Sequence, residues 1–289
     1  MKNTSRAINK FIFCVMIVVL AQFSTFGFIK SIVGVLPKPN VKFSGDFETM
    51  FLSGYLGSSG AIYDTRPNIS NCLSLRSELG DGFFIDGYGW FITSLHTLQS
   101  DSHRVLLNEF EGSFRFGYDY YFKDGSMLET KAGVLWNPAI GYYNGTMDNW
   151  GPYVVQYYKN KFLVPYWDGL WMVSPKRRAR VRMGLRKPFK LTQNLSISPF
   201  CETVWLDKRR FVSRYNEAPK DHFIRGGALG SITTGFSVTY SLSENLKILG
   251  SFSQFDIINS QARRAIKKSD KYYAVCDWPI LKIGISYYF

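Results

Sequence analysis

The chain has 289 residues, a formal net charge of +13, 17% aromatic residues and a mean hydropathy of -0.10. A chain that is rich in aromatic residues but not hydrophobic overall is typical of a wall with one lipid face and one wet face, although a soluble β-sandwich has the same balance. The positive charge comes without any nucleic-acid-binding motif, so we expect no nucleic-acid partner.

The N-terminus has the pattern of a secretory signal peptide. Basic residues precede an apolar segment, residues 11–21, which is too short for a transmembrane helix. We predict a signal peptide over residues 1–27 and one exported domain over residues 28–289. The alternative is an uncleaved membrane anchor.

Three cysteines fall in the predicted mature chain, Cys72, Cys201 and Cys276. An odd number of widely spaced cysteines is neither a disulfide framework nor the paired spacing of a zinc site. We therefore expect no metal site, and no motif indicates a cofactor.

Segments with an apolar residue at every second position recur along the chain, as in strands that have one apolar face. In residues 110–122 the even positions are almost all aromatic, whereas Glu111, Ser113, Arg115 and Asp119 occupy odd positions. An Asp-Gly pair follows at residues 124–125 and supplies the positive φ that a tight hairpin turn requires. The chain then returns with the same alternation.

We predict an all-β fold, an antiparallel transmembrane β-barrel of about twelve strands, which is an even number as in bacterial single-chain barrels. The predicted strands are 41–54, 69–79, 83–96, 107–122, 126–137, 151–158, 161–172, 177–188, 195–206, 224–241, 246–258 and 272–289. Segment 151–172 alternates poorly and contains Pro165, so a barrel of about ten strands is the alternative.

Short turns alternate with longer polar connections, an asymmetry that outer-membrane barrels share. The predicted long connections are 56–68, 99–104, 142–149, 208–222 and 259–270. The last two contain runs of basic residues, which suit either a solvated loop or contact with acidic lipopolysaccharide.

The C-terminal segment has one apolar face, formed by Leu281, Ile283, Ile285, Tyr287 and Phe289. With the signal peptide, the alternating strands and the turn asymmetry, it resembles the last strand of Gram-negative outer-membrane β-barrel proteins. This resemblance implies residence in the outer membrane, contact with its lipids and lipopolysaccharide, and recognition of the strand ending at Phe289 by the barrel-assembly machinery. The size is similar to small twelve-stranded porins for acidic oligosaccharides and to the outer-membrane phospholipase, but no motif singles out either.

Four arginines share one face of a predicted strand, Arg178, Arg180, Arg182 and Arg186, and the residues between them are apolar. A charge on the lipid face near the midplane costs about 2–4 kcal/mol, so the arginines should face the lumen. A file of guanidinium groups suits carboxylate or phosphate recognition and an anion-selective pore. We therefore predict a small porin-like channel that favours small anionic solutes.

The inward-facing positions of the first five predicted strands include acidic residues. We expect these residues to lie across the lumen from the arginines. The predicted opposing acids are Asp46, Glu48, Glu109, Glu111 and Asp119. Their separation from the arginine strand favours a transverse field across an open pore over local pairing. The alternative is a lumen filled with salt bridges, which would make a plugged structural or surface-interaction barrel.

A lipid hydrolase with a site at the rim is a further alternative, because outer-membrane phospholipases carry a His and a Ser two positions apart on one strand. Ser94 and His96 have this spacing in the reverse order. The other histidines, His103 and His222, fall in predicted loops, and no third member of a catalytic group is apparent. We therefore assign no catalytic residue.

Overall fold

The computed structural model describes residues 42–57, 61–99, 104–137, 149–173, 178–206, 228–260, 263 and 275–289. The predicted signal peptide, residues 1–27, lies outside these ranges. No helix within the described ranges is long and apolar enough to cross a membrane.

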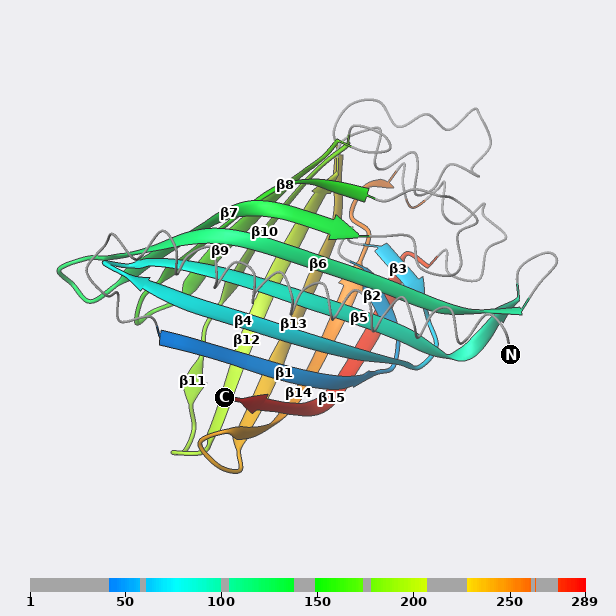
Figure 1. Ribbon diagram of the computed structural model, residues 1–289. Coiled ribbons are helices and arrows are strands. Elements are labelled where there is room, and N and C mark those ends of the chain that lie inside the picture. Colours follow the sequence, from blue (N-terminus) through cyan, green and yellow to red (C-terminus); the bar gives the residue numbers. More distant parts are fainter. Residues whose placement is uncertain are drawn as a thin grey trace, which may run out of the picture.

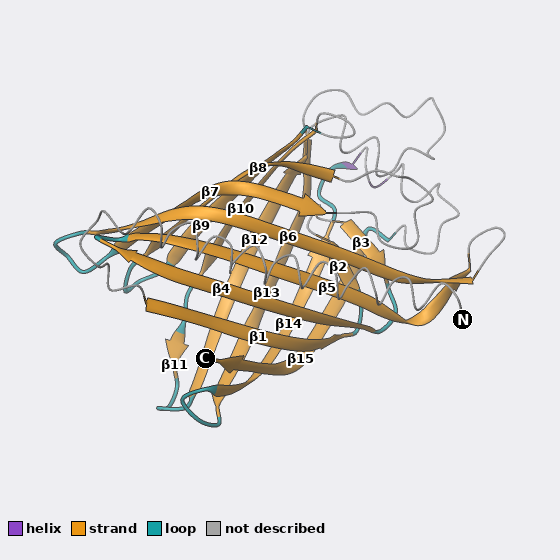
Figure 2. Ribbon diagram, viewed as in Figure 1, coloured by secondary structure: helices purple, strands orange, loops and turns teal. Residues whose placement is uncertain are grey.

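Twelve long antiparallel strands form the wall of a barrel (Figures 1 and 2). They are β1 (Lys42–Leu52), β4 (Asn68–Gly80), β5 (Phe83–Gln99), β6 (Arg104–Tyr121), β7 (Met127–Asn137), β8 (Asn149–Lys159), β9 (Val164–Met172), β10 (Arg178–Arg186), β12 (Leu195–Leu206), β13 (Ala228–Ser241), β14 (Leu246–Asp256) and β15 (Asp277–Tyr288). Three short strands are added: β2 (Tyr55–Gly57) pairs with β3 (Ala61–Asp64), and β11 (Phe189–Lys190) pairs with β12.

The sheet closes on itself, so the barrel has no open edge. Neighbouring strands pair in chain order, β10 pairs with β12, and β15 returns to pair with β1. Closure satisfies the backbone hydrogen bonds that a bilayer cannot satisfy. The prediction of twelve strands is confirmed, and the alternative of about ten is wrong because β8 and β9 both belong to the wall.

The two ends of the barrel differ. One end, called the turn end here, carries tight turns such as Gly80–Gly82 and Phe122–Ser126, and Phe289 also lies there. Gly82 and Gly125 have φ values of 83° and 81°, where a side chain would strain the backbone. In the second turn the Ser126 hydroxyl and backbone N–H both donate to Asp124, which lowers the pKa of that carboxyl.

The opposite end, called the loop end, carries the connection from β1 to β4 with β2 and β3, and the junctions that follow β5, β7, β9, β12 and β14. Strands β5 and β6 are the longest, with 17 and 18 residues, and their hairpin projects past its neighbours at this end (Figure 1). Pairing between these two strands continues to Gln99 and Arg104, the bounds of the predicted long connection, and residues 100–103 lie outside the described ranges.

The outer face of the barrel is apolar. Large outward side chains stay exposed, including Phe116 at 60%, Leu185 at 53% and Ile283 at 56%. Exposure of this kind along every wall is unfavourable in water but is what a lipid-facing surface requires. The chain thus folds as a transmembrane β-barrel, with polar and charged side chains turned to the inside.

Candidate functional site: the lumen

Arg180, Arg182 and Arg186 of β10 face the lumen, whereas the alternate residues Met183 and Leu185 point outward and are exposed. Arg180 and Arg182 contact Asp168, an inward residue of the neighbouring strand β9. The side chain of Arg178 lies outside the described part of the structure. The arginine strand therefore has a carboxylate partner next to it, which the sequence pattern had not indicated.

Asp168 bridges two guanidinium groups. Arg180 Nη2 donates to one carboxylate oxygen at 2.7 Å, and Arg182 Nε donates to the other. Asp168 and Arg180 are 0% and 2% exposed, so the pair is fully enclosed. Arg182 Nε also lies 3.8 Å from Glu202 of β12, which accepts a 2.6 Å hydrogen bond from the Tyr166 hydroxyl.

Exposure rises along β10 toward the turn end. Arg180 is enclosed, the Arg182 side chain is 28% exposed, and Arg186 is exposed to the lumen. The guanidinium carbon of Arg186 lies 5.3 Å from the ring centroid of Tyr157 and 5.5 Å from that of Tyr166. No ion pair to Arg186 is found within the described ranges, so its charge is held by aromatic rings instead of by a carboxylate.

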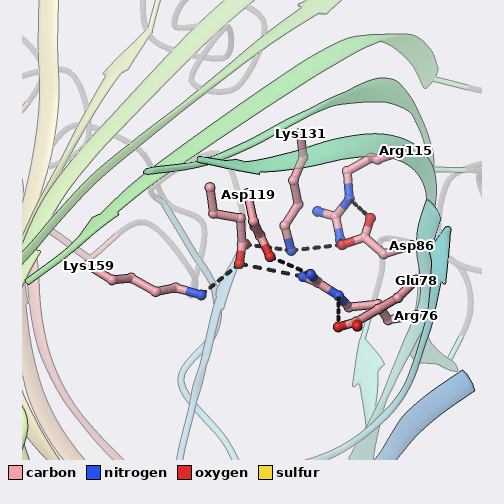
Figure 3. A network of polar contacts seen from close by, with 8 residues as sticks. Arg76, Glu78, Asp86, Arg115, Asp119, Lys131 and Lys159 are labelled. Carbon is pink, nitrogen blue, oxygen red and sulfur yellow. Dashed lines mark hydrogen bonds and ion pairs between the residues drawn. The ribbon is translucent and has the colours of Figure 1, made fainter. Parts of the chain in front are cut away.

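A second group of charges lies on strands β4 to β8, toward the turn end (Figure 3). Its members are the acids Glu78, Asp86, Asp119 and Glu129 and the bases Arg76, Arg115, Lys131 and Lys159. Figure 3 shows the labelled side chains of this group pointing from the wall into the interior of the barrel. The numbers of acids and bases are equal, so the network neutralises itself.

The contacts of this network are short. Arg76 reaches Asp119 at 2.6 Å, and Lys131 bridges Asp86 at 2.7 Å and Glu129 at 2.8 Å. Arg115 makes a two-pronged contact with Asp86 at 2.7 and 3.1 Å. Bidentate pairing of this kind fixes the geometry of both partners.

An aromatic ring supports the network from the wall. The Arg76 guanidinium lies 3.5 Å from the centroid of the Phe84 ring. The ring itself fills the space above Gly117, where an added Cβ would come within 2.1 Å of it. Gly117 thus lets Phe84 lie close to the wall under the charged groups.

These pairs correct one expectation. The separation of acids and arginines along the chain favoured a transverse field over local pairing, but local pairing is what the structure shows for Asp119, Arg180 and Arg182. Neighbouring strands bring together residues that are far apart in the sequence, such as Arg76 and Asp119. Strand-by-strand charge counts miss such partners.

The other predicted opposing acids also face the lumen. Glu111 accepts a 2.6 Å hydrogen bond from the Tyr88 hydroxyl, and Glu109 accepts one of 2.7 Å from Asn137. Asp46 and Glu48 of β1 interact electrostatically with Lys247 and Lys282, respectively. Glu111 also interacts electrostatically with Arg180 of β10.

The luminal face of β13 consists of small side chains, Ser231, Thr233, Gly235, Ser237, Thr239 and Ser241. The neighbouring strands add larger inward residues, among them Glu202 of β12, Phe255 of β14 and Lys282 of β15.

The loop-end half of the lumen is packed. Inward apolar side chains from six strands are there at most 6% exposed: Leu52, Ile92, Leu135, Met172, Phe255 and Ile280. At the turn end, by contrast, the Lys159 and Glu78 side chains are 42% and 51% exposed. Solvent therefore reaches luminal side chains at the turn end, whereas these six apolar side chains at the loop end are enclosed.

The rim hydrolase gains no support from these residues. Ser94 faces inward and is 2% exposed; it pairs with Asn68 of β4, and the pairing of β5 with β6 shifts register between Thr93 and Thr97. The side chain of His96, and the residues His103 and His222, lie outside the described part. No group of three or more potential metal ligands occurs within the described ranges.

Comparison with known proteins gives architecture alone. No family model matches the chain, and no curated protein matches it. Among solved structures, it is similar to a KdgM porin (10% identity, TM-score 0.45, covering 85% of this chain and 99% of that chain). It is also similar to the COG4313 outer membrane channel from Pseudomonas putida F1 (11%, 0.47, 88% and 97%) and to outer membrane phospholipase A from Escherichia coli (11%, 0.45, 84% and 89%). At such low identities and TM-scores, function has to be argued from the residues of this chain.

Proposed function

We propose that this protein is an outer-membrane β-barrel that acts as a small porin-like channel and favours anionic solutes. The observation that carries the proposal is Arg186, an exposed luminal cation without a carboxylate partner within the described ranges. A cation at a water-filled mouth raises the local concentration of anions and lowers their barrier to entry.

Most of the charged side chains in the lumen have a neighbour of opposite charge. The network on β4 to β8 contains as many acids as bases. Asp168 and Glu202 balance Arg180 and Arg182, and the two acids of β1 lie near two lysines. Arg186 is a luminal cation at the turn end to which no ion pair is found within the described ranges.

Membrane residence is the first expected property. The mature protein should be extracted only by detergent and should migrate faster on a gel before heating than after, because a closed barrel of backbone hydrogen bonds resists unfolding at room temperature. Cell fractionation followed by heated and unheated electrophoresis tests this. Recovery of the mature protein in a detergent-free soluble fraction would contradict the proposal.

Anion preference is the second expected property, and it should depend on Arg186. In planar bilayers under a salt gradient, the reversal potential should favour chloride over potassium, and Arg186→Glu should reduce or invert that preference. A change of two charge units at about 10 Å in a wet pore alters the energy of a passing ion by roughly 1 kcal/mol, or about fivefold in relative permeability.

Two comparisons sharpen this measurement. Lys161→Glu makes the same charge change in the turn between β8 and β9, outside the lumen, and should leave the selectivity near that of the wild type. Substitution of Arg180 is unsuitable, because that side chain is enclosed with Asp168 and its loss affects folding. Equal effects of Arg186→Glu and Lys161→Glu would contradict a role for the luminal arginine.

The packed loop-end half favours one other function, a closed barrel that does not conduct. In that case the luminal ion pairs serve structure, and any solute would reach the lumen only from the turn end. Absence of conductance from folded wild-type protein, with absence of solute-driven swelling of liposomes, would establish this alternative over the channel.

A further inference from the structure

Tyr157 and Tyr166 form a stacked pair inside the barrel. They come from the neighbouring strands β8 and β9, where they are directly paired in register. Their ring centroids are 5.6 Å apart and their planes differ by 28°. Both side chains are half-buried, so part of each ring remains open to the lumen.

Each ring is fixed by its surroundings. Tyr166 lies against Gly184 of β10, where an added Cβ would come within 2.2 Å of its ring, and its hydroxyl donates to Glu202 at 2.6 Å. Tyr157 packs against the interior apolar cluster that includes Tyr153 and Val155. The pair is therefore a preformed apolar platform, whose rings lose little conformational freedom when a ligand binds.

Arg186 completes this platform. Its guanidinium lies near both rings, at 5.3 and 5.5 Å from their centroids, and is exposed to the lumen. The nearby Glu202 already accepts the Tyr166 hydrogen bond and lies 3.8 Å from Arg182, so its charge is engaged elsewhere. The rings hold the guanidinium in place and leave its N–H fork without a carboxylate from the described chain.

We propose that Arg186, Tyr157 and Tyr166 form a binding site for a carboxylate attached to an apolar ring. The guanidinium fork matches the two oxygens of a carboxylate, and the exposed parts of the tyrosine rings match an apolar group next to it. This site rests on the proposed channel for its role, as the place where a solute pauses at the turn end, but binding itself does not require conduction.

Binding of sodium benzoate to the detergent-folded full-length protein tests the site, with sodium acetate as the probe that lacks the ring. Saturation-transfer NMR and calorimetry should detect benzoate in preference to acetate. Arg186→Gln should weaken benzoate binding on the order of tenfold or more, because it removes charge-assisted hydrogen bonds. Tyr157→Leu should weaken benzoate binding and leave the weak acetate signal unchanged.

Lys247→Gln is the matched control. Lys247 is also a luminal cation beside a ring, 4.0 Å from the Tyr288 centroid, but it lies near Asp46 and faces one ring only. Its replacement should leave benzoate binding unchanged. Each variant is first shown to be folded by its migration without heating.

Absence of benzoate binding to the folded wild type would overturn the site, as would equal binding by Arg186→Gln. Arg186→Lys keeps the charge and removes the fork, so full affinity in that variant would also overturn it. Conductance is measured separately: binding without conductance supports the site and rejects the channel, whereas anion-selective conductance without benzoate binding supports the channel and rejects the site.

Discussion

Asp168→Ala is expected to destabilise the barrel by roughly 3–5 kcal/mol, the usual cost of removing one partner from a buried ion pair. Asp168 is 0% exposed and accepts hydrogen bonds from both Arg180 and Arg182. Without it, Arg180 would remain an enclosed cation beside a second cation. Urea-induced unfolding in detergent micelles, followed by tryptophan fluorescence, gives the change in the free energy of unfolding.

Glu78→Ala is the control for this measurement. Glu78 also pairs with a luminal arginine, Arg76, but at 3.6 Å and with a side chain that is 51% exposed. An exposed pair contributes about 0–1 kcal/mol, so the control should unfold close to the wild type. Similar free energies of unfolding for Asp168→Ala and Glu78→Ala would show that enclosure of the Asp168 pair has no special effect on stability.

The alternation of the sequence was sufficient to predict most of the wall. On β10 the arginines at even positions had to face inward, because a charged group that faces lipid raises the free energy of the folded barrel. The same rule predicted which way the acids of β6 face. A residue period of two fixes which way a side chain faces once one face is known to meet lipid. In these strands the direction in which each side chain faces therefore followed from the local pattern alone.

Segment 151–172 was the weakest prediction for a physical reason. Its inward residues are themselves apolar, including Tyr153, Val155 and Leu170, which form the interior cluster. Both faces of β8 and β9 thus look alike, and alternation disappears. Pro165 lies just beyond the pairing of β9 with β8, which ends at Tyr166, so it has a partner strand on one side only, where it is paired with Leu185 of β10.

The partners of the luminal charges could not be predicted from the sequence. The direction in which a side chain faces depends on its position within one strand. Which residues form ion pairs depends also on the stagger between strands and on the length of the side chains. Asp168 lies in the ambiguous segment and was not predicted as a luminal acid, although its carboxylate contacts both Arg180 and Arg182. The cradle formed by Gly184 under Tyr166 likewise depends on the register between β9 and β10.

The seam between the last and first strands supports the role proposed for Phe289. The N–H of Phe289 donates to the Gly45 carbonyl at 3.0 Å, and the Gly45 N–H donates back at 2.9 Å. On the outer face, the Phe289 ring occupies the space beside Gly45, where an added Cβ would lie 2.6 Å from the ring. Asn245 holds the other side of this strand through its side-chain bond to the Tyr288 carbonyl.

Gly45→Val and deletion of Phe289 are therefore each expected to leave protein that is exported but not assembled. The valine would displace the ring from its place on β1, and the deletion would remove two backbone hydrogen bonds at the seam that closes the barrel. Heat-modifiable migration of outer-membrane fractions measures the assembled proportion.

Gly250→Val is the matched control. This outward glycine of β14 has only a carbonyl oxygen, at 3.9 Å, near an added Cβ, so the variant should assemble normally. If Gly45→Val and the deletion also assemble normally, Phe289 is a packing detail and closure of the barrel depends on the pairing of β1 with β15 along the rest of its length.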